Sequence, residues 1–270
     1  MYKIIFIDID GTLRNDKKEI TNRTKEAIQQ TVEKGIQVVI CSGRRRKYTE
    51  EVSKEALASK YVIVCNGGEI YDYEKKEVIY QNKLENETMI TLYHMAEKYD
   101  VQLAINAEGD RIVKDPTNTI TDIVLQEPIE HFVKKKVITQ CIFSSTTLEK
   151  SKKIKEEVNL LGNVEIANLS KCLVDSKLPE EQPFFLDIAS KDSSKGNAIK
   201  KLCEYLKIDL KDTVAIGDSY NDLTMFEVVG HRVVMGNAPE DIKKVADEIT
   251  DTNNNDGVAK FLEKLNKEIF

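Results

Sequence analysis

Ile4-Ile5-Phe6-Ile7-Asp8-Ile9-Asp10-Gly11-Thr12 lies near the start of this 270-residue chain. Its first four residues are β-branched or aromatic, and so short an apolar run predicts a fully buried strand rather than a helix. The strand ends in two aspartates one residue apart. Ligands of open parallel sheets bind beyond the carboxyl ends of the strands, which is where Asp8 and Asp10 lie. Because side chains alternate along a strand, both carboxylates can point the same way and share one hard cation such as Mg²⁺.

Asp-x-Asp alone is a weak signal, because aspartate also begins ordinary polar turns. The rest of the chain supplies the context. Short apolar runs over 36–41, 61–65, 213–216 and 232–235 predict further buried strands, and each is followed by small or polar residues. Helical spacing over 21–35, after 192–194 and over 257–265 separates or follows these strands. This alternation predicts an α/β fold with a doubly wound, Rossmann-like parallel sheet.

The pattern changes between the first three strands and the last two. Residues 69–73 and 77–80 predict a hairpin, after which strands and helices follow at unequal spacing. The expected helices cover 86–99 and 148–161, and the expected strands cover 101–105, 111–113, 137–143, 164–167, 172–174 and 184–188. We therefore expect one domain interrupted by another: a core formed by 1–82 and 189–270, and an inserted α+β domain over 83–188 with a largely antiparallel sheet.

Composition narrows the class of protein. The net charge of −6 and the pI near 5.4 argue against nucleic acid or an anionic membrane surface as a partner of the whole molecule. No apolar run approaches the roughly 20 residues of a membrane span, and no signal-peptide pattern precedes the first strand. The five cysteines show no Cys-x-x-Cys spacing, so we expect reduced thiols in a cytoplasmic protein rather than disulfides or a zinc site.

Polar groups at four strand ends or helix starts suggest a phosphate site. Asp218 and Asp222 can add to the acidic set of Asp8 and Asp10, as a third Mg²⁺ ligand and its support. Ser42 and the Gly43 amide offer neutral hydrogen bonds at a helix start, and Lys195 offers a positive charge. A metal, a lysine and backbone amides together stabilise a transferring phosphoryl group, and a carboxylate can be its covalent acceptor.

Four motifs in order give the chain a specific resemblance. They are Asp8-Ile9-Asp10-Gly11-Thr12, Ser42-Gly43-Arg44, Lys195-Gly196 and Gly217-Asp218-Ser219-Tyr220-Asn221-Asp222. The chain resembles haloacid dehalogenase-superfamily phosphatases, most closely the Cof-type sugar-phosphate phosphatases. In that family a mobile cap lies between the second and third motifs, where the α+β insert falls here. Asn66-Gly67-Gly68 resembles the Asn-Gly-Ala that usually precedes the cap.

The resemblance implies a role for each motif residue. Asp8 is the nucleophile and a metal ligand, and Asp10 is the acid/base, whose main-chain carbonyl also binds the metal. Asp218 completes the Mg²⁺ site, and Asp222 orients its neighbours. The phosphate or substrate is bound by Ile9 through its amide and by Ser42, Gly43, Arg44, Lys195 and Asn221.

Several other residues are left open. Arg45, Arg46 and Lys47 fit either a substrate-phosphate clamp or, more commonly, a solvated helix face. Lys134-Lys135-Lys136 is expected at the surface, on a turn before a strand. Tyr220 occupies a variable position of the fourth motif. The three histidines, His94, His131 and His231, match no motif and no metal-ligand spacing.

We therefore expect a Mg²⁺-dependent phosphatase that hydrolyses small phosphorylated metabolites through an aspartyl-phosphate. The resemblance implies sugar phosphates and related small organic phosphates as the substrate class. A closing cap would exclude water and select the substrate. One alternative is a phosphomutase using the same chemistry, and another is a phosphometabolite-binding sensor with little turnover. We expect no nucleic-acid or membrane partner, and a monomer or a small homo-oligomer.

Overall fold

The computed structural model describes residues 2–117, 119–145, 147–169 and 184–268. The chain divides into two compact units. Unit 1 comprises Met1–Arg44, Tyr48–Tyr80 and Ser194–Phe270, and unit 2 comprises Arg45–Lys47 and Gln81–Ser193. The division into a core and a cap over 83–188 stays a prediction, since compactness does not show that unit 2 acts as a cap.

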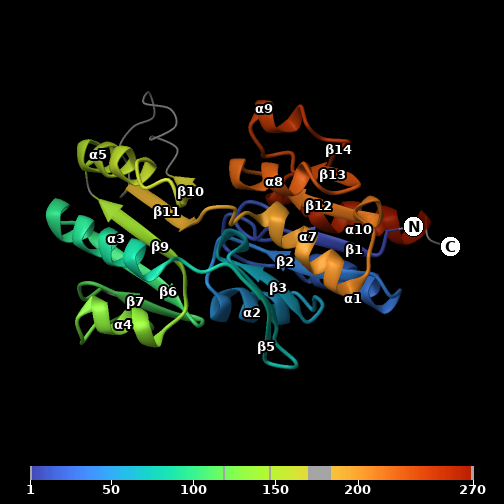
Figure 1. Ribbon diagram of the computed structural model, residues 1–270. Coiled ribbons are helices and arrows are strands. Elements are labelled where there is room, and N and C mark those ends of the chain that lie inside the picture. Colours follow the sequence, from blue (N-terminus) through green and yellow to red (C-terminus); the bar gives the residue numbers. More distant parts are fainter. Residues whose placement is uncertain (1, 118, 146, 170–183, 269–270) are drawn as a thin grey trace. The chain divides into compact units, whose positions relative to one another are not determined.

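Unit 1 is built on an eight-stranded sheet, with the strand order β14-β13-β12-β1-β2-β3-β4-β5 (Figure 1). The pairings from β14 through to β3 are parallel, and β4 is antiparallel to β3. The predicted α/β class with a parallel-rich, Rossmann-like sheet is confirmed. The strands are β1 (Ile4–Ile7), β2 (Gln37–Cys41), β3 (Tyr61–Val64), β4 (Glu69–Asp72), β5 (Glu77–Gln81), β12 (Thr213–Gly217), β13 (His231–Val234) and β14 (Glu248–Ile249).

The central strands are almost entirely apolar because helices cover both faces of the sheet. In β1, Ile5 and Ile7 join one buried cluster with residues of α1 and α10, and Ile4 and Phe6 join another with residues of α7. This double burial explains the continuous apolar runs in the sequence. The helices are α1 (Asn22–Glu33), α2 (Arg46–Glu55), α7 (Lys195–Leu206), α8 (Leu223–Phe226), α9 (Glu240–Lys243) and α10 (Gly257–Glu268).

Unit 2 contains a six-stranded sheet with the order β10-β11-β9-β6-β7-β8. Its pairings are antiparallel except for β7 with β8, which confirms the expected largely antiparallel sheet. The expected strand over 172–174 lies outside the described residues. The elements are β6 (Gln102–Ala107), β7 (Asp110–Val113), β8 (Ile123–Val124), β9 (Ile138–Ser145), β10 (Val164–Leu169), β11 (Phe184–Ser190), α3 (Asn86–Tyr99), α4 (Ile129–Lys135) and α5 (Leu148–Asn159).

One helix of unit 2 differs from the sequence-based expectation. Lys134-Lys135-Lys136 is exposed as expected, but it forms the end of α4 and its cap rather than a turn. Ile129, Phe132 and Val133 are buried, at the i, i+3 and i+4 spacing of a helix. The helix is only 7 residues long, so its periodic signal covers little more than one repeat. Among the described residues, no helix has the length and apolarity needed to cross a bilayer.

Candidate active site

Asp8 directly follows β1 at the carboxyl edge of the unit 1 sheet. Its backbone N–H donates to Ile216 O at 3.1 Å, so the pairing of β1 with β12 continues up to this residue. The residue is only 5% exposed. A carboxylate that is this deeply buried needs charged or hydrogen-bonding partners, because its transfer out of water without them costs several kcal/mol of free energy.

Asp10 does not lie with Asp8, although alternation along a strand predicts that both carboxylates can share one cation. The strand ends at Ile7, and the chain turns there, so the period of two is lost. Asp10 Oδ2 instead accepts a hydrogen bond from Arg44 Nε at 2.8 Å, and its side chain is 48% exposed. The two aspartates thus occupy different environments, one dry and one solvated.

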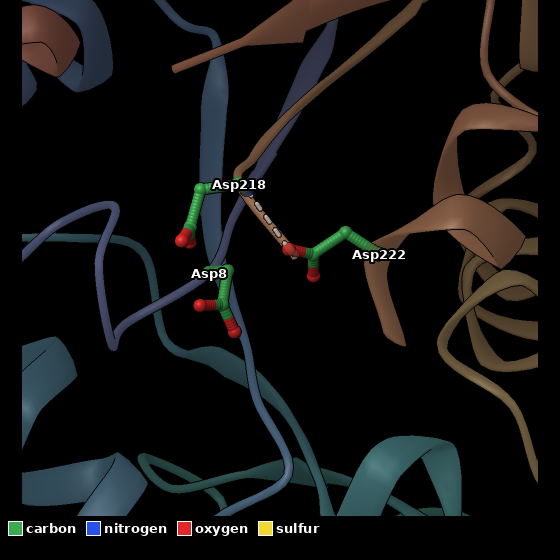
Figure 2. A group of neighbouring side chains, drawn as sticks. All are labelled: Asp8, Asp218 and Asp222. Carbon is green, nitrogen blue, oxygen red and sulfur yellow. Dashed lines mark hydrogen bonds between the residues drawn. The ribbon is translucent and has the colours of Figure 1, made fainter. Parts of the chain in front are cut away.

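Asp8 lies instead with two carboxylates from the other end of the chain, Asp218 and Asp222. Each of the three offers an oxygen, and these oxygens lie within 4.8 Å of one another (Figure 2). Asp218 follows β12, the neighbour of β1, so the two parallel strands deliver their aspartates to the same edge. Among the described residues, these three carboxylates are the one group that could hold a metal ion, and the group contains neither histidine nor cysteine.

Asp222 differs from the other two because its oxygens already accept several hydrogen bonds. Oδ2 accepts from the backbone N–H groups of Asp218 and Ser219, both at 3.0 Å, and Figure 2 shows this carboxylate reaching the Asp218 backbone. Oδ1 accepts from Lys195 Nζ at 2.7 Å. These bonds hold the loop after β12 in place, which supports an orienting role for Asp222.

Lys195 supplies the positive charge inside this acidic group. Its Nζ lies 2.5 Å from Asp8 Oδ1, and the lysine side chain is 1% exposed. It is the first residue of α7, and this start is fixed by Ser194, whose hydroxyl accepts from Asn197 N as an N-cap. The attraction of Asp222 and Asp8 outweighs desolvation and raises the pKa of Lys195 above its usual range, so the ammonium stays charged.

The charges of these three carboxylates and the Lys195 ammonium do not balance without a further cation. Three carboxylates, of which Asp8 and Asp222 are buried and Asp218 is partly exposed, leave two negative charges after the one ammonium is counted. Accordingly, burial raises the pKa of Asp8 to about 8, with Asp222 and Asp218 adding to the rise and Lys195 opposing it. A hard divalent cation would neutralise this excess, and carboxylate oxygens are the ligands that such a cation prefers. The residues present therefore fit a divalent metal.

Gly11 and Thr12 hold Asp218 from the side of β1. Thr12 Oγ1 donates to Asp218 Oδ1 at 2.7 Å. Gly11 adopts a φ of +80°, and a Cβ at this position would come within 2.4 Å of Asp218 Oδ2. The position requires glycine both for its left-handed backbone and for the space that the carboxylate occupies.

The loop after β2 brings Ser42, Gly43 and Arg44 to the same edge. Ser42 is buried, and its hydroxyl accepts from Arg44 N at 3.2 Å, while Arg44 carries the bond to Asp10 described above. The Arg44 guanidinium also lies 5.6 Å from the centre of the Tyr48 ring. Ile9, between the two aspartates, is fully buried.

Asn221 lies in the short 3₁₀ turn that follows β12, η3 (Tyr220–Asp222). Its Oδ1 accepts from Ser219 Oγ, and its Nδ2 donates to Asn66 Oδ1 at 3.1 Å. Tyr220 points to a different neighbour: its hydroxyl donates to Asp241 Oδ2 at 2.9 Å, and the residue is 45% exposed.

The family of the chain follows from comparison with known proteins. The family model of haloacid dehalogenase-like hydrolases matches residues 5–262, which includes all four motifs and the insert. The chain belongs to this family. The match confirms the resemblance drawn from the motifs, and the solved structures described next confirm the fold.

Relatives of this hydrolase span its whole length. A 5-amino-6-(5-phospho-D-ribitylamino)uracil phosphatase of Bacillus subtilis is 30% identical, over 97% of this chain and 98% of the relative. A phosphatase of the same organism, YwpJ, is also 30% identical, over 97% of this chain and 99% of the relative. With such full-length relatives, this haloacid dehalogenase-like hydrolase is a phosphatase.

Solved structures of other proteins superpose on this one over nearly the whole chain. A haloacid dehalogenase-like hydrolase from Bacteroides thetaiotaomicron superposes with a TM-score of 0.83 and 29% identity, over 98% of this chain and 100% of the other. The protein TM0651 from Thermotoga maritima gives a TM-score of 0.80 and 27% identity, over 98% and 97%. The hydrolase shares the whole fold of these proteins, insert included.

Sequence reasoning missed part of this site. Tyr48, whose hydroxyl accepts from Arg14 Nη1 at 2.8 Å, lies outside the four motifs and carries no local signal. The sequence places Asn66 in a pattern that precedes the insert but predicts no function for it. Its contact with Asn221 joins residues 155 positions apart, which no local spacing can reveal.

Proposed function

We propose that this phosphatase is Mg²⁺-dependent and hydrolyses small phosphorylated metabolites through an aspartyl-phosphate on Asp8. The proposal rests on the position of Asp8. Its carboxylate is buried, contacts the buried Lys195 ammonium, and lies beside the Asp218 and Asp222 carboxylates. A carboxylate held in this way is fixed in orientation beside a positive charge, as a covalent acceptor of a phosphoryl group needs to be.

In the first step, an oxygen of Asp8 attacks phosphorus, and the bond from phosphorus to the ester oxygen breaks. Asp10 gives its proton to the departing oxygen, so that an alcohol leaves rather than an alkoxide. The partial exposure of Asp10 supports this division, because a proton donor must exchange protons with solvent between turnovers. Asp8 needs the opposite environment, and two carboxylates placed in different environments are typical of such a pair.

In the second step, Asp10 removes a proton from water as the water oxygen attacks phosphorus. The bond to Asp8 then breaks, releasing inorganic phosphate and restoring the carboxylate. Lys195, Asn221, the Ser42 hydroxyl and the amides of Ile9 and Gly43 would bind the phosphoryl oxygens, and Arg44 would contact the substrate. Such donors stabilise charge in the transition state at no cost of reorganisation.

Asp8 and Asp218 would hold Mg²⁺ by their carboxylates and Asp10 by its main-chain carbonyl, with Asp222 supporting the loop. When bound, the ion supplies positive charge that neutralises the phosphoryl oxygens and keeps Asp8 ionised. Magnesium suits this site because it binds through one or two carboxylates together with substrate phosphate.

For the substrate, we infer a small phosphate ester with a hydroxyl-rich carbon chain. Two relatives that span nearly the whole chain, both from Bacillus subtilis and 30% and 29% identical, are named as phosphatases of a phosphoribitylamino compound, a phosphate ester on a polyol chain. Sugar phosphates share this chemistry and remain the first class to test. We expect unit 2 to act as the cap that selects among such esters.

The test is phosphate release from a panel of phosphorylated sugars, polyols, nucleotides and cofactors, with Mg²⁺ and with chelator. Release should need Mg²⁺ and vanish in Asp8→Asn. Asp212→Asn is the matched control: Asp212 precedes β12 while Asp218 follows it, so the control aspartate lies at the far end of the same strand. When the reaction is quenched with acid, the trapped phosphoryl-enzyme should carry the phosphoryl group on Asp8.

Other outcomes assign the site differently. Interconversion of phosphate isomers without phosphate release would identify a phosphomutase with the same nucleophile. Tight binding of one ester without turnover would identify a sensor. Substantial release by Asp8→Asn would remove the aspartyl-phosphate from the proposal.

A further inference from the structure

The 3₁₀ turn after β3, η1 (Cys65–Gly67), contacts the phosphate-binding loop that follows β2. Cys65 N donates to Arg44 O at 2.9 Å, and Asn66 N donates to Ser42 O at 3.1 Å. The backbone of η1 therefore fixes the backbone on either side of Gly43. This is a direct connection between the turn and one of the four motifs.

The same turn lies against the start of α7. Gly67 has a φ of +93°, and a Cβ there would come within 2.1 Å of Ser194 O. Ser194 caps α7, whose first residue is Lys195. The turn thus touches a second motif, again by close backbone approach.

The Asn66 side chain completes these contacts with a third motif. Its Oδ1 accepts from Asn221 Nδ2 at 3.1 Å, and a Cβ on Gly43 would lie 2.8 Å from the same oxygen. Asn66 is 2% exposed. The other end of the Asn221 amide accepts from Ser219 Oγ, so this amide is held from both sides.

The backbone of Asn66 is held in an unfavourable conformation. Asn66 has a φ of +53° and a ψ of +34°, and Cys65 before it also has a φ of +53°. Left-handed conformations cost free energy in residues other than glycine, although asparagine tolerates them best. Backbone strain of this kind persists where the surrounding structure imposes it, and it is frequent at functional sites.

We propose that Asn66 is a positioning residue for the phosphate site, acting through Asn221. An amide nitrogen carries two N–H donors; the bond to Asn66 uses one and thereby orients the second toward bound phosphate. This inference rests on the proposed function, which assigns phosphate binding to Asn221. Asn66 itself touches no reacting atom.

The experiment compares Asn66→Gly, Asn66→Ala, Asn221→Ala and the double variant N66G/N221A in the full-length protein. Binding of inorganic phosphate with Mg²⁺ present is measured by calorimetry, alongside KM, kcat and thermal unfolding. Asn66→Gly removes the side chain but accepts the positive φ, so we expect about tenfold weaker phosphate binding with little change in melting temperature. Asn66→Ala should lose the same affinity and also melt lower, because alanine resists this φ.

The double variant shows whether Asn66 acts through Asn221. In the Asn221→Ala background, Asn66→Gly should weaken phosphate binding by less than about twofold, since the partner is already gone. Full additivity would overturn the proposal, as would wild-type affinity in Asn66→Gly. If one single variant does not fold, the other is carried through the same cycle.

The two proposals fail in distinguishable ways. A wild-type protein that hydrolyses esters and binds phosphate, with Asn66→Gly equal to it, would leave the proposed function intact and remove the role of Asn66. A wild-type protein that binds no phosphate even with Mg²⁺ would overturn both.

Discussion

The Lys195 ammonium lies 2.5 Å from Asp8 Oδ1, and both side chains are almost fully buried. Lys195 is the cation that the described structure shows bonded to both Asp8 and Asp222. A buried ion pair contributes little net stability when intact, but removing one partner leaves the other charge stranded. Lys195 is therefore as much a structural requirement of the acidic cluster as a candidate phosphate ligand.

The first prediction concerns Lys195→Met, which keeps the side-chain length and removes the charge. We expect the free energy of unfolding to fall by about 3–5 kcal/mol with chelator present, and phosphatase activity to be lost. Added Mg²⁺ should restore more stability to the variant than it adds to the wild type, because Asp8 and Asp222 have then lost the ammonium that they contact. Urea unfolding with Mg²⁺ and with chelator measures both effects.

Lys201→Met is the matched control for this variant. Lys201 belongs to the same helix, α7, but pairs with Glu204 at the surface. We expect its unfolding free energy to stay within about 0.5 kcal/mol of the wild type. Equal stability of the two variants in chelator would contradict the role assigned to Lys195.

The second prediction separates two demands on Gly11. Gly11→Ala should be destabilised both by its φ of +80° and by the approach of Cβ to Asp218 Oδ2. Gly35→Ala provides the control, since Gly35 has a φ of +85° but nothing within 4 Å of the added Cβ. Both should lose about 1–2 kcal/mol from the backbone, while only Gly11→Ala should also lose affinity for the divalent cation. Unfolding and metal titration of both variants measure this; equal metal affinity would show that Asp218 moves aside without consequence.

Much of the fold was predictable because local pattern and long-range packing agree. The apolar runs that form β1, β2, β3 and β12 are continuous because both faces of the sheet are covered. Helix α4 escaped prediction because its periodic stretch is too short to stand out from a charged turn. The two-residue strands β8 and β14 carry too few residues for any period.

The site was predictable only as far as chain order places residues at strand ends. Asp8 and Asp218 meet because parallel neighbours β1 and β12 end at the same edge. The fate of Asp10 was not predictable, because the turn after Ile7 ends the strand alternation, and Arg44 comes from another loop. Asn66 shows the same limit: its partner is distant in sequence, and only the three-dimensional packing reveals the contact.

A third prediction tests an ion pair remote from the site. Arg232 donates to both oxygens of Asp247, and these bonds lower the pKa of Asp247 to about 2. A lowered pKa means that the pair stabilises the fold above the unfolded pKa of about 3.9, and that this contribution is lost as the pH falls toward 2. Because both side chains are about a third or more exposed, we expect Asp247→Asn to lose only about 0.5–1 kcal/mol at pH 7.

Acid unfolding measures this effect. The difference in unfolding free energy between Asp247→Asn and wild type should shrink between pH 4 and pH 2, while ester hydrolysis at pH 7 stays unchanged. A difference that is constant over this range would mean that Asp247 acts by packing rather than by its charge.

The last prediction links pH to metal binding through Asp8. In the protein without a bound metal ion, burial raises the pKa of Asp8 to about 8. Between about 4 and 8 the folded protein then holds a proton that the unfolded chain has released, so the stability of the cation-free protein falls as pH rises through this window. A divalent cation requires the ionised carboxylate, so its binding should expel that proton below pH 8, and its affinity should rise by up to about tenfold per pH unit between pH 6 and 8. Calorimetric Mg²⁺ titrations in buffers of different ionisation enthalpy should show close to one proton released at pH 6.5 and almost none at pH 9. Asp8→Asn cannot release this proton, so its residual Mg²⁺ binding should lose the dependence; proton release equal at both pH values in the wild type would show that Asp8 is already ionised beside Lys195.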